Sequence, residues 1–456
     1  MKRNIDMLNE PLLPSIIRYT VPIMLTSLLQ LLFNAADLVI VGRFCGSIYV
    51  GAVSATNAIT NLVINLFIGL SVGAGVAVAH GLGGQSNEDV HRTVHTALPT
   101  ALFGGAFLIL IGVFFAEDLL KLMNTPENVL PYSTLYMRIY FCGMVFSMVY
   151  NFCASILRAA GDTKSPLIYL TIAGVVNVFL NVIFVTVFHM DVDGVALATI
   201  ISQGISSVLV VIALMRRTDA CRLTLSKMRF YKAQFAKMIR IGLPAGIQSS
   251  LFSISNVIIQ SSINSFNSDA IIAGNGAASN IEGFVYVIMN SFHQAAVNFT
   301  GQNAGAHKFD RVKKIFGTCL ASVTVAGLIS GFGVWFFGES LLSIYITDST
   351  DAISYGLIRL TYIGLPYFLC GMMDTSTGAL RGLGSSFVPM VISVLGVCGI
   401  RIAWIYTVFQ IPQYHTPQCL FLSYTFSWLA TFLFQTMAFL ILFKKKTNID
   451  KLTTQH

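Results

Sequence analysis

An aspartate interrupts the first long apolar segment of the sequence. Asp37 lies in LLQLLFNAADLVIVG, with apolar residues for a full helical turn after it, and Asn34 precedes it by three positions on the same helical face. A carboxylate surrounded by hydrocarbon must be neutral or paired, so this group is expected to bind a proton or a sodium ion. The alternatives are a structural hydrogen-bond anchor and a residue hydrated near the outer surface.

Two amides recur one helical turn apart in a later apolar segment. Asn177 and Asn181 lie in TIAGVVNVFLNVIFV and supply carbonyl oxygens and N–H donors to one face, although amides also join helices to one another. With Asp37 and Asn34 they form a predicted ion-coupling site for H⁺ or Na⁺. We expect no other metal and no cofactor, because the eight cysteines contain no CxxC pair and the histidines show no HExxH pattern.

The second half of the sequence holds three further charges within apolar segments. They are Asp374 in CGMMDTSTGALRG, Arg401 in GVCGIRIAWIY and Glu282 in AASNIEGFVYVIMN. Each costs roughly 2.5–3.5 kcal/mol or more at the centre of a membrane helix. We expect Asp374 and Arg401 to neutralise each other, as a proton-sensitive switch or as a fixed structural pair. Glu282 has no partner apparent from the sequence, and both a functional and a structural role stay open.

Two arginines occupy equivalent positions at the ends of apolar segments. The symmetry of Arg158 and Arg381 favours cytoplasmic anchors over substrate binding. The sequence contains no GxxxxGK[ST] loop, which excludes an ATP-driven pump within this chain. It also contains no nucleophile elbow, so we expect no enzyme.

The composition is that of a lipid-embedded protein. Of 456 residues only 11% are charged while 55% are hydrophobic, with a mean hydropathy of +0.73; ordinary globular domains carry roughly 25% charged residues. The net charge of +8 lies in short clusters between apolar runs, so we expect membrane lipid and not nucleic acid as partner. The N-terminus lacks the pattern of a cleaved signal peptide.

Twelve apolar stretches are long enough to cross a bilayer, which takes about 20 residues. Each is continuously apolar, which predicts helices and not barrel strands. The predicted spans are 15–41, 52–79, 94–116, 131–157, 165–188, 194–215, 237–263, 270–298, 313–337, 354–380, 387–409 and 418–443. The first two are separated by the short RFCGS turn near Arg43.

The basic residues predict the orientation. With the N-terminus placed in the cytoplasm, the inner loops hold 23 Lys and Arg residues and the outer loops two. Arg138, Arg359 and Arg401 fall within predicted spans. This asymmetry predicts that both termini are cytoplasmic, which requires an even number of spans.

The chain also repeats itself. A shift of 222 places Pro22 on Pro244, and a shift of 223 places LRAAGDTKSP (157–166) on LRGLGSSFVP (380–389). Two copies of a six-helix unit insert the same way up, which predicts a pseudo-twofold axis along the membrane normal and a central cleft. A pair of bundles suits a transporter that rocks between two openings, whereas channels are commonly rings of subunits.

The expected fold is therefore an all-α integral membrane protein of twelve transmembrane helices in two six-helix bundles. The predicted domains are an N-terminal bundle at 1–215, a basic cytoplasmic linker at 216–236 and a C-terminal bundle at 237–456.

The segment PIMLTSLLQLLFNAADLVIVG, the LRAAGDTKSP turn and its LRGLGSSFVP echo resemble the multidrug and toxic compound extrusion (MATE) family. GLPAGIQSSLFSISN and CGIRIAWIY are similar to its bacterial DinF-like branch. The resemblance implies a secondary exporter of cationic or amphipathic compounds in exchange for protons or sodium. It implies that Asp37 binds the coupling ion, assisted by Asn177 and Asn181.

The sequence departs from the family pattern at two places. Many relatives carry aspartate at Asn181, and sodium-coupled NorM-like relatives carry a glutamate in the seventh span, where 241–266 here contains no acid. The first departure weakens the ion site of the N-terminal half, and the second favours protons over sodium. We expect a monomer in the bacterial plasma (inner) membrane with small-molecule substrates. The alternatives are a flippase for a lipid-linked oligosaccharide, an ion channel or a membrane-embedded enzyme.

Overall fold

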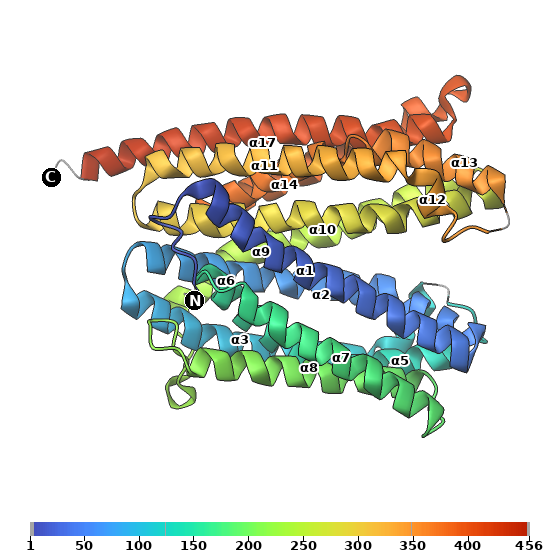
Figure 1. Ribbon diagram of the computed structural model, residues 1–456, viewed down its shortest axis with the longest axis horizontal. Coiled ribbons are helices and arrows are strands. Elements are labelled where there is room, and N and C mark those ends of the chain that lie inside the picture. Colours follow the sequence, from blue (N-terminus) through green and yellow to red (C-terminus); the bar gives the residue numbers. More distant parts are fainter. Residues whose placement is uncertain (1–3, 124, 348, 454–456) are drawn as a thin grey trace. The chain divides into compact units, whose positions relative to one another are not determined.

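The computed structural model describes residues 4–123, 125–347 and 349–453, and over these residues it contains helices and no strand (Figure 1). Helices follow from the continuously apolar segments, because a backbone surrounded by lipid must satisfy its own N–H and C=O groups. The chain divides by its internal contacts into two compact units. Unit 1 comprises Met1–Asp6 and Leu25–Ser250, and unit 2 comprises Met7–Met24 and Leu251–His456.

Unit 1 is built around one central helix, which packs against three others. Its helices are the later part of α1 (Leu12–Ile40), the π-helical turn η1 (Val41–Cys45), α2 (Ser47–Gly83), α3 (Asn87–Phe114), α4 (Ala116–Leu122), α5 (Leu130–Cys142), α6 (Met144–Ala159), α7 (Lys164–Thr186), α8 (Val192–Met215), the 3₁₀ turn η2 (Leu225–Lys227) and the first part of α9 (Lys232–Asn264). The central helix α6 contacts α2, α3 and α8, and α7 lies along α8.

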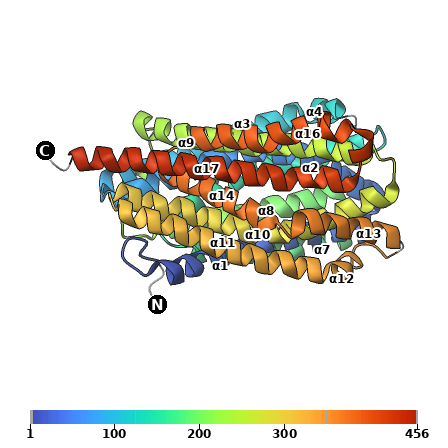
Figure 2. The same cartoon turned by 90° about the horizontal axis from the view of Figure 1, so that it is seen from above.

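Unit 2 repeats this plan with more breaks. Its remaining helices are α10 (Asp269–Gly305), α11 (Phe309–Phe336), α12 (Gly338–Leu342), α13 (Thr350–Arg359), η3 (Leu360–Gly364), α14 (Tyr367–Gly382), α15 (Phe387–Ser393), η4 (Val394–Gly399), α16 (Ile400–Tyr406), η5 (Val408–Gln410), η6 (Pro412–Tyr414) and α17 (Pro417–Thr453). The helices α10, α11, α14 and α17 run side by side (Figures 1 and 2).

The number of spans agrees with the sequence. Among the described residues nine helices are long and apolar enough to cross a membrane, and two bent pairs raise the number to 11. The pairs are α5–α6, bent by 46°, and α13–η3 with α14, bent by 41°. The remaining predicted span lies in α10, whose 37 residues include many amide and hydroxyl side chains. The prediction of an all-helical, multi-pass membrane protein is confirmed.

The repeated turn has the same backbone in both units. Gly161 and Gly384 lie at φ +84° and +83°, in the left-handed region that glycine adopts without strain. The amide of Asp162 donates to the Leu157 carbonyl, and that of Ser385 donates to the Leu380 carbonyl. Both α6 and α14 therefore end in a Schellman motif, which supports the duplication.

Some boundaries differ from the sequence-based domains. The RFCGS turn does separate two helices, at Gly46 with φ +107°. However, α9 begins at Lys232 inside the predicted linker 216–236. Contacts also assign the first part of α1 to unit 2 and the first part of α9 to unit 1. A division at the connector between bundles could not reveal this exchange, because each long helix changes unit partway along its length.

Candidate functional site

The structure joins the first-span aspartate to the asparagine pair. Asn181 Nδ2 donates to Asp37 Oδ1 at 2.5 Å and to Asn177 Oδ1 at 3.3 Å, and Asn177 Nδ2 donates to Thr199 Oγ1 at 3.4 Å. Asn177 and Asn181 are buried, with 4% and 0% of their surfaces exposed. The predicted grouping of Asp37, Asn177 and Asn181 therefore exists as a chain of hydrogen bonds from α1 through α7 to α8.

A glycine of α7 leaves room for an aromatic ring of α1. A Cβ atom on Gly174 would lie 1.7 Å from the Phe33 ring, so only glycine lets this ring sit against α7. Phe33 is one turn before Asp37, and Gly174 is two turns before Asn181 on the same face. The Phe33 ring on Gly174 and the Asp37–Asn181 hydrogen bond are thus two contacts between α1 and α7.

The surroundings of Asp37 are polar but contain no compensating cation. Within the described part of unit 1 no lysine or arginine is buried, and no ion pair to Asp37 is formed. Two stacked tyrosines of α5, Tyr136 and Tyr140, lie within electrostatic range of the carboxyl. Asn181 Oδ1 is buried and accepts no hydrogen bond from the described residues, so this oxygen is open to a proton donor or a cation.

Asn34 does not join this group. Its side chain is exposed and makes no hydrogen bond to Asp37 among the described residues, although both belong to α1. A spacing of three places two residues on one face of a helix, but the neighbouring helix decides which of them is covered. Here α7 covers Asp37.

In unit 2 the structure supplies the partner of Glu282 that the sequence did not. Arg359 Nε and Nη2 donate to the two carboxylate oxygens of Glu282 at 2.9 and 2.7 Å, and Arg359 Nη1 donates to Asn275 Oδ1. The side chains of Arg359 and Glu282 are 7% and 6% exposed. Such a two-pronged contact compensates a desolvation cost of several kcal/mol per ion.

Arg401 does not pair with Asp374, contrary to the prediction. Its guanidinium carbon lies 3.9 Å from the centroid of the Tyr424 ring and 5.7 Å from that of Trp428, and its Nε donates to Ser427 Oγ at 3.0 Å. The partners are therefore aromatic and hydroxyl groups of α17. Charges in consecutive spans attract only if they face each other, and here α16 turns Arg401 towards α17.

Asp374 instead belongs to a group with a histidine and an arginine. His293 Nδ1 donates to the backbone carbonyl of Asp374 at 2.7 Å, which leaves Nε2 as an acceptor for Arg381 Nη1 at 3.4 Å. The carboxyl of Asp374 also lies within electrostatic range of Arg381. Arg381 is only 6% exposed and lies in the last turn of α14, so it is a buried group of unit 2, and its role as a cytoplasmic anchor stays a prediction.

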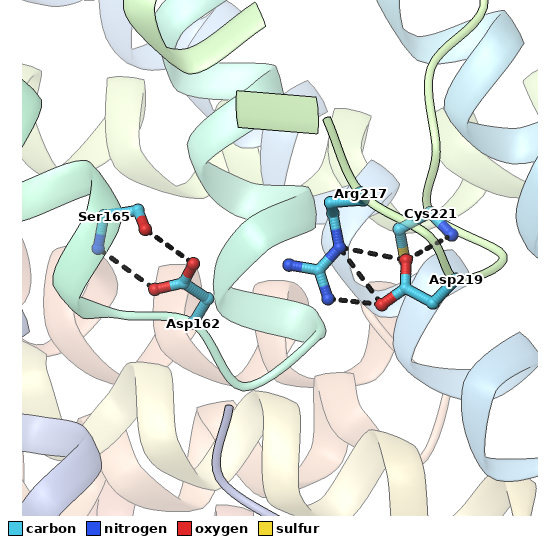
Figure 3. Close-up of polar contacts among 5 residues, drawn as sticks. All are labelled: Asp162, Ser165, Arg217, Asp219 and Cys221. Carbon is cyan, nitrogen blue, oxygen red and sulfur yellow. Dashed lines mark hydrogen bonds and ion pairs between the residues drawn. The ribbon is translucent and has the colours of Figure 1, made fainter. Parts of the chain in front are cut away.

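Arg158, its counterpart in unit 1, is half-buried beside a capped turn. Asp162 accepts from the Ser165 amide at 3.0 Å and from its hydroxyl at 2.6 Å, which caps α7 (Figure 3). Across from this turn, Arg217 forms an ion pair with Asp219 (Figure 3). Burial works against ionisation of Asp219, but the hydrogen bond and charge of Arg217 outweigh it and hold the Asp219 pKa below its usual value.

The connector between the units is docked on α3. His95 Nδ1 donates to the His91 carbonyl at 2.7 Å, and His95 Nε2 accepts from the Thr224 amide at 3.0 Å. Burial raises the pKa of the nearby Cys221 thiol to about 12, so it stays protonated. The connector is an ordered part of unit 1.

Sequence reasoning missed three features of these sites. Arg359 was recognised as lying within a span but was not matched to Glu282, which is 77 positions away. Tyr424 and Trp428, the aromatic partners of Arg401, were not singled out in the sequence. A π-helical turn lies close to three of these charges: η1 after Asp37, η3 directly after Arg359 and η4 before Arg401. Such turns are frequent at functional sites.

An all-helical membrane protein that consists of two related units, each with buried polar groups, has the architecture of a secondary transporter. The MatE family model matches the chain twice, over residues 22–183 and 244–407. The chain therefore belongs to the MatE family of transporters, and the two matches, offset by 222 residues at their starts, agree with the repeat.

Relatives and solved structures agree with this assignment. The chain is 27% identical to a probable multidrug resistance protein, YoeA, of Bacillus subtilis, covering 84% of each chain. It is 27% identical to the probable multidrug resistance protein YpnP of the same organism, over 87% of this chain and 88% of the relative. An outward-facing multidrug resistance MATE transporter shares the fold, with a TM-score of 0.90 and 18% identity over 97% of this chain and 99% of that one. The transporter class predicted from sequence is confirmed, and the DinF-like branch stays a prediction.

Proposed function

We propose that this protein exports cationic or amphipathic compounds across the bacterial plasma membrane in exchange for protons. The observation that carries the proposal is the contact of Asp37 with Asn181 in the absence of a buried base in the described part of unit 1. A carboxyl without a cationic partner in a membrane can change its charge by taking up a proton, whereas an ion-paired carboxyl is held charged. The names of the relatives support drugs as cargo.

The exchange runs through the charge state of Asp37. Proton uptake from outside neutralises the carboxyl, and this changes the contact of α1 with Asn181 and the adjacent turn η1. Substrate leaves, the units move relative to each other, and the proton is released inside as new substrate binds. One charge crossing roughly 150 mV supplies about 3.5 kcal/mol, enough for roughly a 300-fold gradient.

Sodium is the alternative coupling ion. Asp37, Asn177 Oδ1 and Asn181 Oδ1 offer oxygen ligands, and one of them accepts no hydrogen bond from described residues. Protons are preferred because 241–266 contains no acid, whereas the sodium-coupled NorM-like relatives carry a glutamate in that span. The orientation with both termini in the cytoplasm belongs to the same proposal and follows from the basic loops. The names of the relatives give no support to the flippase alternative.

The test is efflux of ethidium and a small panel of dyes from proteoliposomes under separately imposed proton and sodium gradients. We expect proton-driven efflux in the wild type and at least a tenfold loss in Asp37→Asn. The matched control is Asp118→Asn, an exposed acid at the end of unit 1, which should retain efflux. Undiminished proton-driven efflux in Asp37→Asn would remove this residue from the mechanism, and efflux driven only by sodium would replace the coupling ion.

A further inference from the structure

The buried charges of unit 2 do not balance. Among its described residues, buried side chains include three guanidinium groups and two carboxyl groups: Arg359, Arg381, Arg401, Glu282 and Asp374. Even with both carboxyls ionised, one positive charge is left without a carboxylate. If either acid takes up a proton, the excess grows.

The geometry shows where this excess lies. Both oxygens of Glu282 are engaged by Arg359, and Asp374 lies in electrostatic range of Arg381. Among the described residues no carboxylate forms an ion pair with Arg401. Arg401 also acts electrostatically on Glu282, but Arg359 already engages both oxygens of that carboxylate, so Arg401 contacts no carboxylate of the described residues directly.

The hydrogen-bonding capacity of Arg401 is also largely unused. A guanidinium carries five N–H donors, and the Nε donor reaches Ser427 Oγ. The four N–H groups on the two Nη nitrogens donate to no atom of the described residues. These nitrogens are not among the side-chain atoms that protein seals off completely, although Arg401 as a whole is only 4% exposed. They therefore keep a small surface that a water molecule can reach.

Aromatic rings hold the guanidinium in place. The Tyr424 ring lies 3.9 Å from its central carbon and Trp428 lies 5.7 Å away. Together with the bond to Ser427 on the Nε side, this contact leaves the Nη edge unoccupied. A fixed, planar pair of donors matches the two oxygens of a carboxylate or phosphate, which an ammonium group cannot do.

We propose that Arg401 binds the carboxylate or phosphate group of a transported solute. This assigns unit 2 an oxyanion subsite and extends the cargo to compounds that carry an acidic group. That the bound solute is transported rests on the proposed function, whereas the subsite itself rests on the contacts of Arg401. The ring of an aromatic acid would also find Tyr424 and Trp428 beside the subsite.

The test measures binding of benzoate, phenyl phosphate and their neutral analogue benzamide to the full-length protein in lipid nanodiscs. Tryptophan fluorescence is the readout, since Trp428 is close to Arg401. We expect saturable binding of benzoate or phenyl phosphate and none of benzamide. Arg401→Lys, which keeps the charge but loses the fork, should bind at least tenfold more weakly, and Arg401→Gln should not bind.

The matched control is Arg138→Gln, an exposed arginine of unit 1, which should bind as the wild type does. Equal responses to benzoate and benzamide, or wild-type binding by Arg401→Gln, would overturn the proposal. Displacement of benzoate by equimolar chloride would assign the site to an inorganic ion and overturn it as well. If Arg401→Gln does not fold, Arg401→Lys decides.

The two proposals fail separately. Asp37→Asn should lose proton-driven dye efflux and still bind benzoate. Absence of dye efflux in a wild type that binds benzoate would defeat the proposed function alone. Dye efflux by a wild-type protein that binds neither benzoate nor phenyl phosphate would defeat the oxyanion subsite alone.

Discussion

The two units share one helical repeat but have opposite polarity inside. In the described part of unit 1 the carboxyl of Asp37 contacts amides and meets no buried base. In unit 2 three arginines accompany two acids, and one of these pairs is a two-pronged salt bridge. A duplicated scaffold can therefore keep its helix order while its halves take different charges. The described part of unit 1 holds a carboxyl without a buried cation, and unit 2 holds its acids beside arginines.

Breaking the salt bridge of unit 2 should have the largest effect on the stability of the protein. Arg359→Met leaves Glu282 ionised and buried without its partner, which costs about 3–5 kcal/mol of stability. Asp37→Asn in unit 1 replaces one polar group with another and should cost about 1 kcal/mol or less. Thermal unfolding of the purified protein in detergent compares the two.

The double variant Glu282→Gln/Arg359→Met is the control for this comparison. Removing both charges removes the desolvation cost as well as the attraction, so most of the lost stability should return. If the double variant is as unstable as Arg359→Met, the loss is one of packing, and the contrast in charge between the units does not explain it.

Removing the amide contact in unit 1 should have an intermediate effect on stability. Asn181→Ala removes the donor to Asp37 Oδ1 and should cost about 1–3 kcal/mol of stability, together with a severalfold loss of proton-driven efflux. Asn151→Ala is the matched control, because its amide donates to the Ser147 carbonyl at 2.8 Å and does not contact Asp37. Equal efflux by the two variants would mean that Asn181 acts only as a structural link.

The half-exposed pair Arg217–Asp219 should have the smallest effect on stability. Its contact resembles that of Arg359 with Glu282, but the Asp219 side chain is 44% exposed, so solvent screens the attraction and limits it to below about 1 kcal/mol. The pKa of Asp219 is lowered from 3.8. Its contribution is therefore present above about pH 4 and is lost as pH falls through the lower, folded-state pKa.

Unfolding of Asp219→Asn and wild type over a range of acidic pH checks this sign. The wild type should be slightly more stable near neutral pH, and the two should converge as Asp219 is protonated. A difference that grows on acidification would show that the carboxylate is destabilising in the folded protein.

Local periodicity explains what could be predicted from the sequence. Continuous apolar segments predicted the helices, and the repeated LRAAGDTKSP turn predicted two units that end α6 and α14 in the same motif. Asn177 and Asn181 could be grouped because one helical turn separates them. Their contact with Asp37 was inferred from the cost of an isolated carboxylate in lipid.

Contacts between distant helices explain what could not be predicted. Glu282 and Arg359 meet because α10 packs against α13, and nothing in their spacing indicates this. Arg401 turns to Tyr424 because a π-helical turn precedes α16, and such turns carry no clear sequence signal. A count of the charges within each predicted half would have indicated an excess of arginine over acid. It would not have shown which arginine contacts no carboxylate among the described residues.

The central claim is that Asp37 carries the exchanged proton, and proton release on substrate binding tests it most directly. Purified protein in weakly buffered detergent solution is mixed with ethidium while a pH-indicating dye records released protons. We expect about one proton per wild-type molecule, none from Asp37→Asn and an unchanged release from Asp374→Asn. Release from Asp37→Asn equal to that of the wild type, with ethidium still bound, would contradict the account.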